Sequence, residues 1–205
     1  MNERDLSVVE NLMEKINGIE GDNPNLSLLV DTSFTQIAKT NLLLLKGFLD
    51  LEGKKGYFVV LDRPHQYMAY LLHMHDVNQE NIWYIDTVTS MSGEEKVDRD
   101  NVNFVDGPFH IKHLLDVFEP GGGKESRFAS IDEIDFLLID NISSMLNYNS
   151  MDKVEEFIKL FKNMIDESSG MLGCFVIDSD SHPELSKVLK EHIETHIDID
   201  DCKEA

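Results

Sequence analysis

The chain has 205 residues, of which 41% are hydrophobic, with a formal net charge of -21 at pH 7 and a sequence pI of about 4.5. That length can bury one sizeable core, and no linker rich in Pro, Ser or Gly divides the sequence, so we expect one domain over residues 1–205. The negative charge excludes a nucleic-acid backbone or an anionic membrane as the main partner, because both require a positive footprint.

The cysteines and the first residues indicate the compartment. Cys174 and Cys202 provide neither a disulfide framework nor metal-ligand spacing. Residues 1–5 lack the positive and apolar regions of a signal peptide, and no apolar run of about 18 residues occurs. We therefore predict a cytoplasmic protein.

In chain order, the first predicted element is a helix over residues 6–16, where apolar residues recur at helical spacing. Asn17-Gly18 predicts its end, because Gly favours the backbone conformation that closes a helix. A loop with Gly and Pro follows, so residues 1–25 are expected to be an N-terminal helix and loop before the first strand at 26–30.

Five short apolar runs each end at an aspartate, a pattern typical of buried parallel strands. They cover residues 28–31, 57–62, 82–86, 136–140 and 174–178. Their final residues are Asp31, Asp62, Asp86, Asp140 and Asp178. Helical segments between the runs indicate an α/β fold with a parallel sheet, and ligands of such sheets bind beyond the carboxyl ends of the strands. The five acids are expected either to line one crevice or, alternatively, to cap helices and start turns.

The segment after the first strand is where a phosphate-binding loop would lie. Aligned with G-x-x-x-x-G-K-[ST], Lys39 and Thr40 match the lysine and the hydroxyl, but Ser33 and Ala38 replace both glycines. Glycine lets such a loop wrap its N–H groups around phosphates at low conformational cost. The alternative interpretation is that Lys39 and Thr40 lie on an ordinary helix surface.

The region between the third and fourth of these strands has a weaker pattern. A helix is predicted over residues 108–118, and His110, His113 and Asp116 lie on one face of it, so they form either a metal site or a solvated surface. The glycine-rich residues 120–124 follow a helix and not a strand, which favours a connector over a phosphate loop.

The rest of the chain continues the alternation of helices and strands, and ends in a frayed tail over residues 200–205. The remaining helices are predicted over residues 66–75, 152–165 and from Pro183, and the last strand over 197–199.

From Gly56 to Ile199 the chain resembles the archaeal and bacterial KaiC-like ATPases of the RecA superfamily. The resemblance rests on the order of several segments more than on any one motif. These are residues 57–64 (a strand, an acid, one residue and Pro), Ile85-Asp86, residues 136–149 (the Walker B strand and its polar continuation), the helix 154–165, the strand 173–178 and residues 182–185.

The resemblance implies a three-layer RecA-like (P-loop NTPase) fold, with a mainly parallel central sheet and helices on both faces. In that family Lys39 would meet the phosphates of ATP in a loop that includes Ser33 and Ala38. Thr40 and Asp140 would hold Mg²⁺, and Asp62 would activate water.

The sequence departs from the family where the chemistry depends on it most. Both Walker A glycines are absent, one acid stands before Pro64 where the family often has two, and no arginine finger is evident. Phosphoryl transfer depends on positioning and charge stabilisation, so we expect ATP hydrolysis to be absent or very weak.

We therefore predict a degenerate, non-catalytic regulatory or protein-interaction module that self-associates. Two alternatives stay open: a working ATPase with an atypical Walker A, and a receiver-like signalling domain. A receiver would need paired acids after its first strand and a lysine after its last core strand, but Thr32 follows Asp31, and Ser179 follows Asp178.

Overall fold

The computed structural model describes residues 1–21, 25–93, 96, 99–107, 117–118, 129, 131–193 and 195–203. The predicted metal site at His110, His113 and Asp116 and the loop 120–124 lie outside the described residues, as does most of the helix predicted over 108–118.

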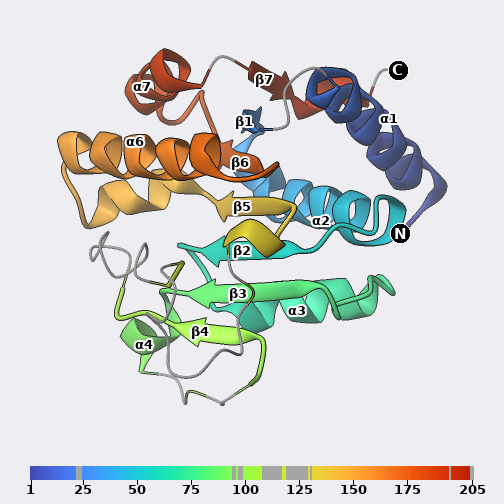
Figure 1. Cartoon of the computed structure of the whole chain (residues 1–205), viewed down its shortest axis with the longest axis horizontal. Helices are drawn as coiled ribbons and strands as arrows, with labels where there is room; N and C mark the ends of the chain where they lie inside the picture. Colours follow the sequence, from blue (N-terminus) through green and yellow to red (C-terminus); the bar gives the residue numbers. More distant parts are fainter. Residues whose placement is uncertain are drawn as a thin grey trace.

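Seven parallel strands form one sheet in the order β4-β3-β2-β5-β6-β1-β7 (Figure 1). The strands are β1 (Leu26–Asp31), β2 (Gly56–Val60), β3 (Ile82–Asp86), β4 (Val102–Phe104), β5 (Phe136–Asp140), β6 (Leu172–Ile177) and β7 (Thr195–Asp198). The five apolar runs that end in aspartate form the five inner strands, and β5 lies at the centre.

Helices cover both faces of the sheet, which confirms the predicted three-layer α/β fold (Figure 1). The helices are α1 (Glu3–Glu20), α2 (Ile37–Lys46), α3 (His65–Met74), α4 (Thr89–Ser92), α6 (Met151–Glu167) and α7 (Pro183–His192). Shorter helical turns are Phe34–Gln36, Gly47–Leu51, Ile131–Glu133, Ile142–Asn147 and Ile199–Cys202.

Alternate residues of each strand enter two separate cores. In β2, Phe58 and Val60 pack with α1, α2 and α3, whereas Tyr57 and Val59 pack with α6 and α7. Side chains of a strand alternate between its faces, so a sheet covered on both sides needs apolar residues at every position. This explains why β2, β5 and β6 are buried along their whole length.

Two predicted ends were wrong. The first helix does not stop at Asn17-Gly18 but continues to Glu20, because Ile19 still packs against the core and the N–H of Gly21 closes the helix on the carbonyl of Asn17. The predicted frayed tail instead begins as a 3₁₀ turn, in which Cys202 is buried and its carbonyl accepts a hydrogen bond from Asn11.

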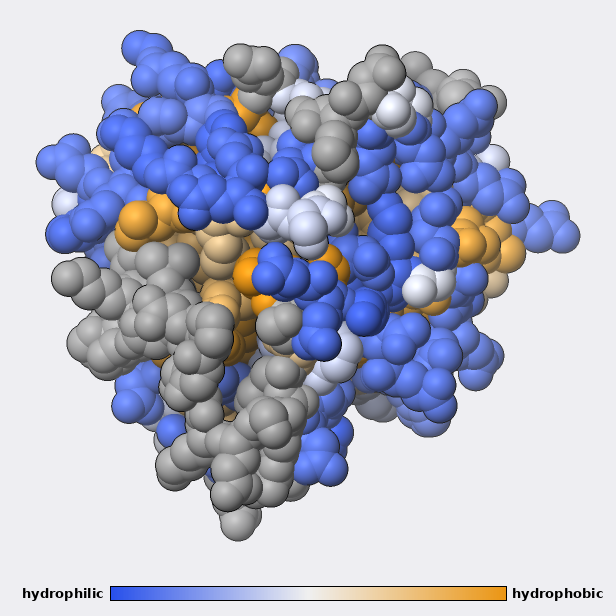
Figure 2. Space-filling model, viewed as in Figure 1, coloured by the Kyte–Doolittle hydropathy of each residue, from blue (hydrophilic) through white to orange (hydrophobic). Residues whose placement is uncertain are grey.

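The surface is mostly hydrophilic. Hydrophilic residues cover most of the described surface in the view of Figure 2. In the part of the chain that the structure describes, no helix is both long and apolar enough to cross a membrane.

Candidate functional site

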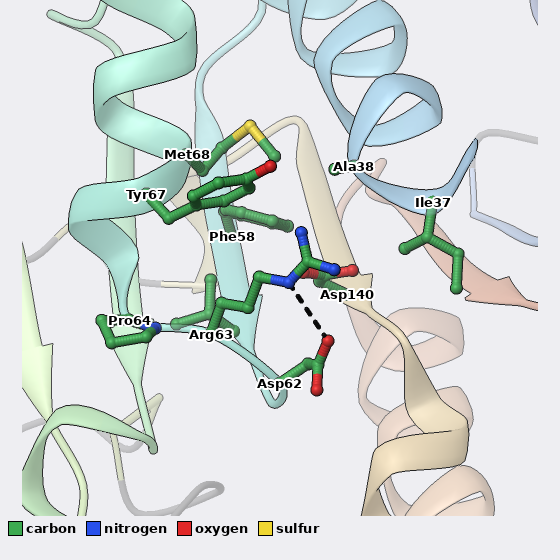
Figure 3. A pocket seen from close by; sticks show the side chains of 10 residues that line it. Ile37, Ala38, Phe58, Asp62, Arg63, Pro64, Tyr67, Met68 and Asp140 are labelled. Atoms are coloured by element: carbon green, nitrogen blue, oxygen red, sulfur yellow. Dashed lines mark ion pairs between the residues drawn. The ribbon is translucent and has the colours of Figure 1, made fainter. Parts of the chain in front are cut away.

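A small crevice opens where β2 and β5 end, beside the start of α2 and α3 (Figure 3). Its lining residues are Ile37, Ala38, Phe58, Val60, Asp62, Arg63, Pro64, Tyr67, Met68 and Asp140. Its cavity volume is about 10 Å³. One water molecule needs about that much space, so the crevice beside Asp140 as folded holds little more than one water.

Asp140 is the buried acid of this crevice. It is 7% exposed, and its Oδ1 accepts a hydrogen bond of 2.5 Å from Nδ2 of Asn41 on α2. Burial raises the pKa of Asp140 to about 7; the hydrogen bond from Asn41 opposes that rise, the negative charge of Asp62 adds to it, and the positive charge of Arg63 opposes it. This carboxyl therefore changes its charge near neutral pH.

Arg63 extends between the two acids of the crevice (Figure 3). Its Nε lies 3.4 Å from Oδ2 of Asp62, and its guanidinium lies 4.9 Å from the centre of the Tyr67 ring. No role was predicted for Arg63, although its position directly after Asp62 could have indicated one. Because both partners of the ion pair are partly exposed, water screens their attraction.

The segment in the Walker A position folds without glycine. Ser33 has an extended backbone, residues 34–36 form a 3₁₀ turn, and Ala38 lies in the first turn of α2. The backbone N–H of Phe34 donates to Oδ2 of Asp178, and the N–H of Gln36 donates to the carbonyl of Ser33. A phosphate cradle uses N–H groups of this segment, and here these two are bonded within the chain.

Lys39 and Thr40 turn away from the crevice. Nζ of Lys39 lies 2.5 Å from Oδ1 of Asp5 on α1. The hydroxyl of Thr40 is buried and lies 2.9 Å from the hydroxyl of Thr32. The structure thus brings together Ala38, Asp62 and Asp140, but the neighbour of Asp140 from α2 is Asn41.

Asn41 is the residue that sequence reasoning missed. It is fully buried, and its Oδ1 has no hydrogen-bond partner. A polar side chain directly before four consecutive leucines was the available signal, because a polar group in a buried helix needs a partner.

The acids of β1 and β6 hold loops together, in line with the alternative interpretation of strand-end aspartates. Asp31 accepts a hydrogen bond of 3.0 Å from the N–H of Ser179. Asp178 accepts hydrogen bonds from Phe34 and from both the N–H and the hydroxyl of Ser181. These two acids therefore connect the segment after β1 with the segment after β6.

Asp86, at the end of β3, is fully buried among donors. It accepts hydrogen bonds from the N–H and Nδ1 of His65, from the N–H of Val88, and from the N–H and hydroxyl of Thr89. Burial alone would raise its pKa, but the hydrogen bonds from His65 and Thr89 lower it to about 2. Asp86 is thus a structural anion that ties α3 and α4 to β3.

The arrangement around Asp140 does not match what Mg²⁺ with a nucleotide requires. Mg²⁺ takes hard oxygen ligands in an octahedron, usually one or two carboxylates together with phosphates and waters. Here the hydroxyl of Thr40 is paired with Thr32, and Asp140 is desolvated beside an amide. Among the described residues, no group of three or more His, Cys, Asp or Glu side chains is placed to hold a metal ion.

Comparison with solved structures identifies the fold. A KaiC-like protein from the hyperthermophilic archaeon Pyrococcus horikoshii matches with a TM-score of 0.57 at 15% identity, over 85% of this chain and 72% of that chain. This chain has a KaiC-like, RecA-type fold.

A second solved structure similar to this chain is that of an uncharacterized P. horikoshii protein in complex with an unknown peptide. It matches with a TM-score of 0.55 at 9% identity, over 85% of this chain and 76% of that chain. No family model matches the sequence, and no curated protein matches it.

Proposed function

We propose that this KaiC-like chain is a non-catalytic regulatory or protein-interaction module. The observation that carries the proposal is that the segment in the Walker A position is already bonded within the protein. Phe34 donates its N–H to Asp178, and Lys39 pairs with Asp5 on α1. The groups that would receive phosphates have internal partners.

Nucleotide binding at this position would have to break these contacts. A phosphate at the N–H of Phe34 would displace the Asp178 carboxylate or lie against it, and two negative charges at that distance repel. Removing one partner of a hydrogen bond to a charged group costs about 1.5–3 kcal/mol. A nucleotide that reached Asp140 would also have to open the crevice there, whose volume is about 10 Å³.

What the chain retains is its scaffold. All five predicted inner strands and both apolar cores are present. A fold kept intact while its phosphate loop is altered is most simply explained by contacts with other proteins. A protein of similar fold that is bound to an unknown peptide supports this class of function.

The test is isothermal titration of the purified chain with Mg-ATP, together with a phosphate-release assay. We expect no binding heat and no turnover. Ser33→Gly/Ala38→Gly restores the two glycines, and any binding that it gains would show what the loop lacks. Turnover of about one per second, the low end of ordinary enzymes, which is lost in Lys39→Ala but kept in the exposed-lysine control Lys153→Ala, would overturn the proposal.

Turnover that depends on Lys39 would favour the alternative, an ATPase with an atypical Walker A. One observation supports it: Asp140 is a buried acid with a pKa near 7 in a crevice, and such perturbed groups gather at functional sites. In that case Lys39 would have to leave Asp5 when the nucleotide binds.

A further inference from the structure

A second cavity opens beyond the carboxyl ends of β2, β3 and β5, which point to the same side of the sheet (Figure 1). Its volume is about 230 Å³. Ligands of parallel sheets bind beyond this edge. The residues that line it come from the end of β2, from the turn and helix after β3, and from the turn after β5. We call it the Asp62–Tyr148 pocket.

The pocket has an apolar wall that is partly open to solvent. Leu61, Val88, Met91 and Tyr148 line it, and of these Met91 and Tyr148 are 40% and 51% exposed. A thioether adapts its shape to an apolar group, and an aromatic face attracts a cation. This wall suits an apolar stem that ends in a positive charge.

Asp62 is the only charged residue among the described residues of the lining. Its Oδ2 lies 3.4 Å from Nε of Arg63, which is longer than an N–H···O hydrogen bond of about 2.7–3.2 Å. Its other oxygen points away from Arg63 (Figure 3). Asp62 accepts no hydrogen bond from any residue that the structure describes. Since a carboxylate accepts several hydrogen bonds, Asp62 has acceptor sites left for a ligand.

Ser144 adds a buried polar group without a partner. It is 6% exposed and lines the pocket, and its hydroxyl makes no hydrogen bond to a residue that the structure describes. Its backbone N–H donates to the carbonyl of Asn141. Polar side chains buried to this extent normally have a hydrogen-bond partner. A polar group bound in the cavity would provide one.

We propose that the Asp62–Tyr148 pocket binds a lysine or arginine side chain of a protein partner. The carboxylate of Asp62 pairs with the ammonium or guanidinium group, and the hydroxyl of Ser144 supplies a further acceptor. Met91 and Tyr148 cover the apolar stem, which such side chains bury while their charge stays hydrogen-bonded. The net charge of -21 attracts a basic partner to the chain.

Other ligand classes fit the pocket less well. An anion would meet Asp62 and no positive side chain among the described lining residues. A metal ion would find a single carboxylate there, and Mg²⁺ or Ca²⁺ needs several oxygen ligands. A purely apolar group would leave Asp62 and Ser144 unpaired. Pockets for small molecules usually enclose about 300–1,000 Å³, so this smaller volume suits one side chain better than a nucleotide.

A basic side chain as ligand gives the proposed interaction module a partner of defined chemistry, and the inference rests on that proposed function. A free alkylamine carries the same chemistry as a lysine side chain. The experiment therefore compares the two sources.

Titration of the whole chain with blocked amino acids, followed by amide NMR, is the direct test. N-acetyl-arginine amide and N-acetyl-lysine amide carry the cation on its stem, N-acetyl-norleucine amide lacks the charge, and N-acetyl-glutamate amide reverses it. We expect the two cationic probes to shift the signals of Ser144, Asn147 and Tyr148. Their dissociation constants should be millimolar, because one side chain buries little surface. The other two probes and butylamine should bind more weakly.

Matched variants locate the binding. Asp62→Asn keeps the size of the side chain and removes its charge, so we expect it to weaken the cationic probes about fivefold, the upper end for a partly exposed charge pair. Asp132→Asn, at an exposed acid outside the pocket, should leave the affinity unchanged. Tyr148→Ala should weaken the same probes about twofold, whereas Tyr70→Ala, at a tyrosine of α3 that is 60% exposed, should not.

The outcomes separate this inference from the proposed function. Equal affinity for the norleucine and arginine probes, unchanged affinity in Asp62→Asn, or the absence of any shift far above millimolar concentration would overturn the cation pocket. Tighter binding of butylamine than of the lysine probe would overturn the choice of a protein partner. The proposed function would survive each of these results as long as Mg-ATP neither binds nor turns over. Nucleotide turnover in a chain that binds the arginine probe would instead overturn the proposed function and leave the pocket.

Discussion

Asp86 and Asp140 occupy equivalent places in the sheet, yet their surroundings give them opposite chemistry. Each is the last residue of a parallel strand and each is buried, at 0% and 7% exposure. Asp86 accepts five hydrogen bonds and its pKa falls to about 2, whereas Asp140 accepts one from Asn41 and its pKa rises to about 7.

The difference shows that burial alone does not decide the charge of an acid. Burial favours the neutral carboxyl in both places, and the hydrogen bonds around Asp86 reverse that effect, whereas one hydrogen bond and the nearby charge of Asp62 leave the pKa of Asp140 raised. The donors of Asp86 come from the turn that follows β3 and from the start of α3. At the end of β5 the chain turns differently, because the next residue, Asn141, has a left-handed backbone. The donor to Asp140 comes instead from Asn41 on α2.

The largest effect is expected for Asp86→Asn. The amide keeps the size of the side chain but loses an acceptor and places donors against those of His65 and Thr89. Breaking such a buried cluster from one side costs about 3–5 kcal/mol in the free energy of unfolding. Urea denaturation measures it, and the exposed-acid control Asp132→Asn should change stability by less than about 0.5 kcal/mol.

The same residue predicts an acid limit to stability. The pKa of Asp86 is about 2 in the folded chain and about 3.9 when unfolded. The lowered pKa stabilises the fold above pH 4, by about 2–3 kcal/mol, and this contribution is lost as the pH falls from about 4 to about 2. A stability difference between the unaltered chain and Asp86→Asn that did not shrink over that interval would contradict the assignment.

Asp140→Asn is expected to act in the opposite direction, with a smaller effect. The pKa of Asp140 is raised, so the ionised carboxyl destabilises the fold, and this penalty grows as the pH rises from about 4 to about 7. The asparagine variant should therefore be more stable at pH 8 by about 2 kcal/mol, roughly half of the full linkage value because Arg63 and water relax around the charge.

Below about pH 4 the gain from Asp140→Asn should vanish, since Asp140 is then neutral in both folded and unfolded chains. Urea titrations at pH 4, 6 and 8 would follow the trend. If Asp140→Asn were less stable than the unaltered chain at pH 8, the prediction would be wrong. The charged form of Asp140 would then be stabilised by a group that does not contact it in this structure.

The smallest effect is expected for Asp62→Asn. It removes a negative charge near Asp140 and frees Arg63 from its ion pair, and both changes favour the ionised Asp140. Exposed charge pairs contribute about 0.2–1 kcal/mol, so we expect the pKa of Asp140 to fall by about half a unit. Carboxyl carbon NMR measures that pKa directly; an upward shift, or an equal shift in Asp132→Asn, would be inconsistent with this geometry.

The sequence was sufficient for the five inner strands of the sheet but not for the face that α2 presents. The inner strands are almost continuously apolar up to their final aspartates, a pattern typical of parallel strands that are covered on both faces. A helix turns by 100° per residue, however, so the Walker A alignment pointed to Thr40 while the residue that contacts Asp140 is Asn41. Only tertiary packing fixes such a rotation.

Two short elements were missed for a different reason. β4 has three residues, Val102–Phe104, in a charged region, which is too few for a periodic pattern to be recognised. The C-terminal turn is held by Ile199 and Cys202, two apolar residues three apart, and this signal only has meaning once α1 lies beside them. Arg63 was likewise visible in sequence, but its contact with Tyr67 was not.

The position of β1 has a consequence for how the chain is made in the cell. Both strands that flank β1 come late in the sequence, since β6 begins at Leu172 and β7 at Thr195. On the ribosome, the apolar residues Leu28, Leu29 and Val30 emerge before their partner strands, and they stay unpaired until β6 and β7 have been synthesised. Such long-range pairing is slow, and the unpaired apolar strand is prone to misfolding and aggregation while it is exposed. We therefore expect the nascent chain to depend on chaperones until β7 leaves the exit tunnel.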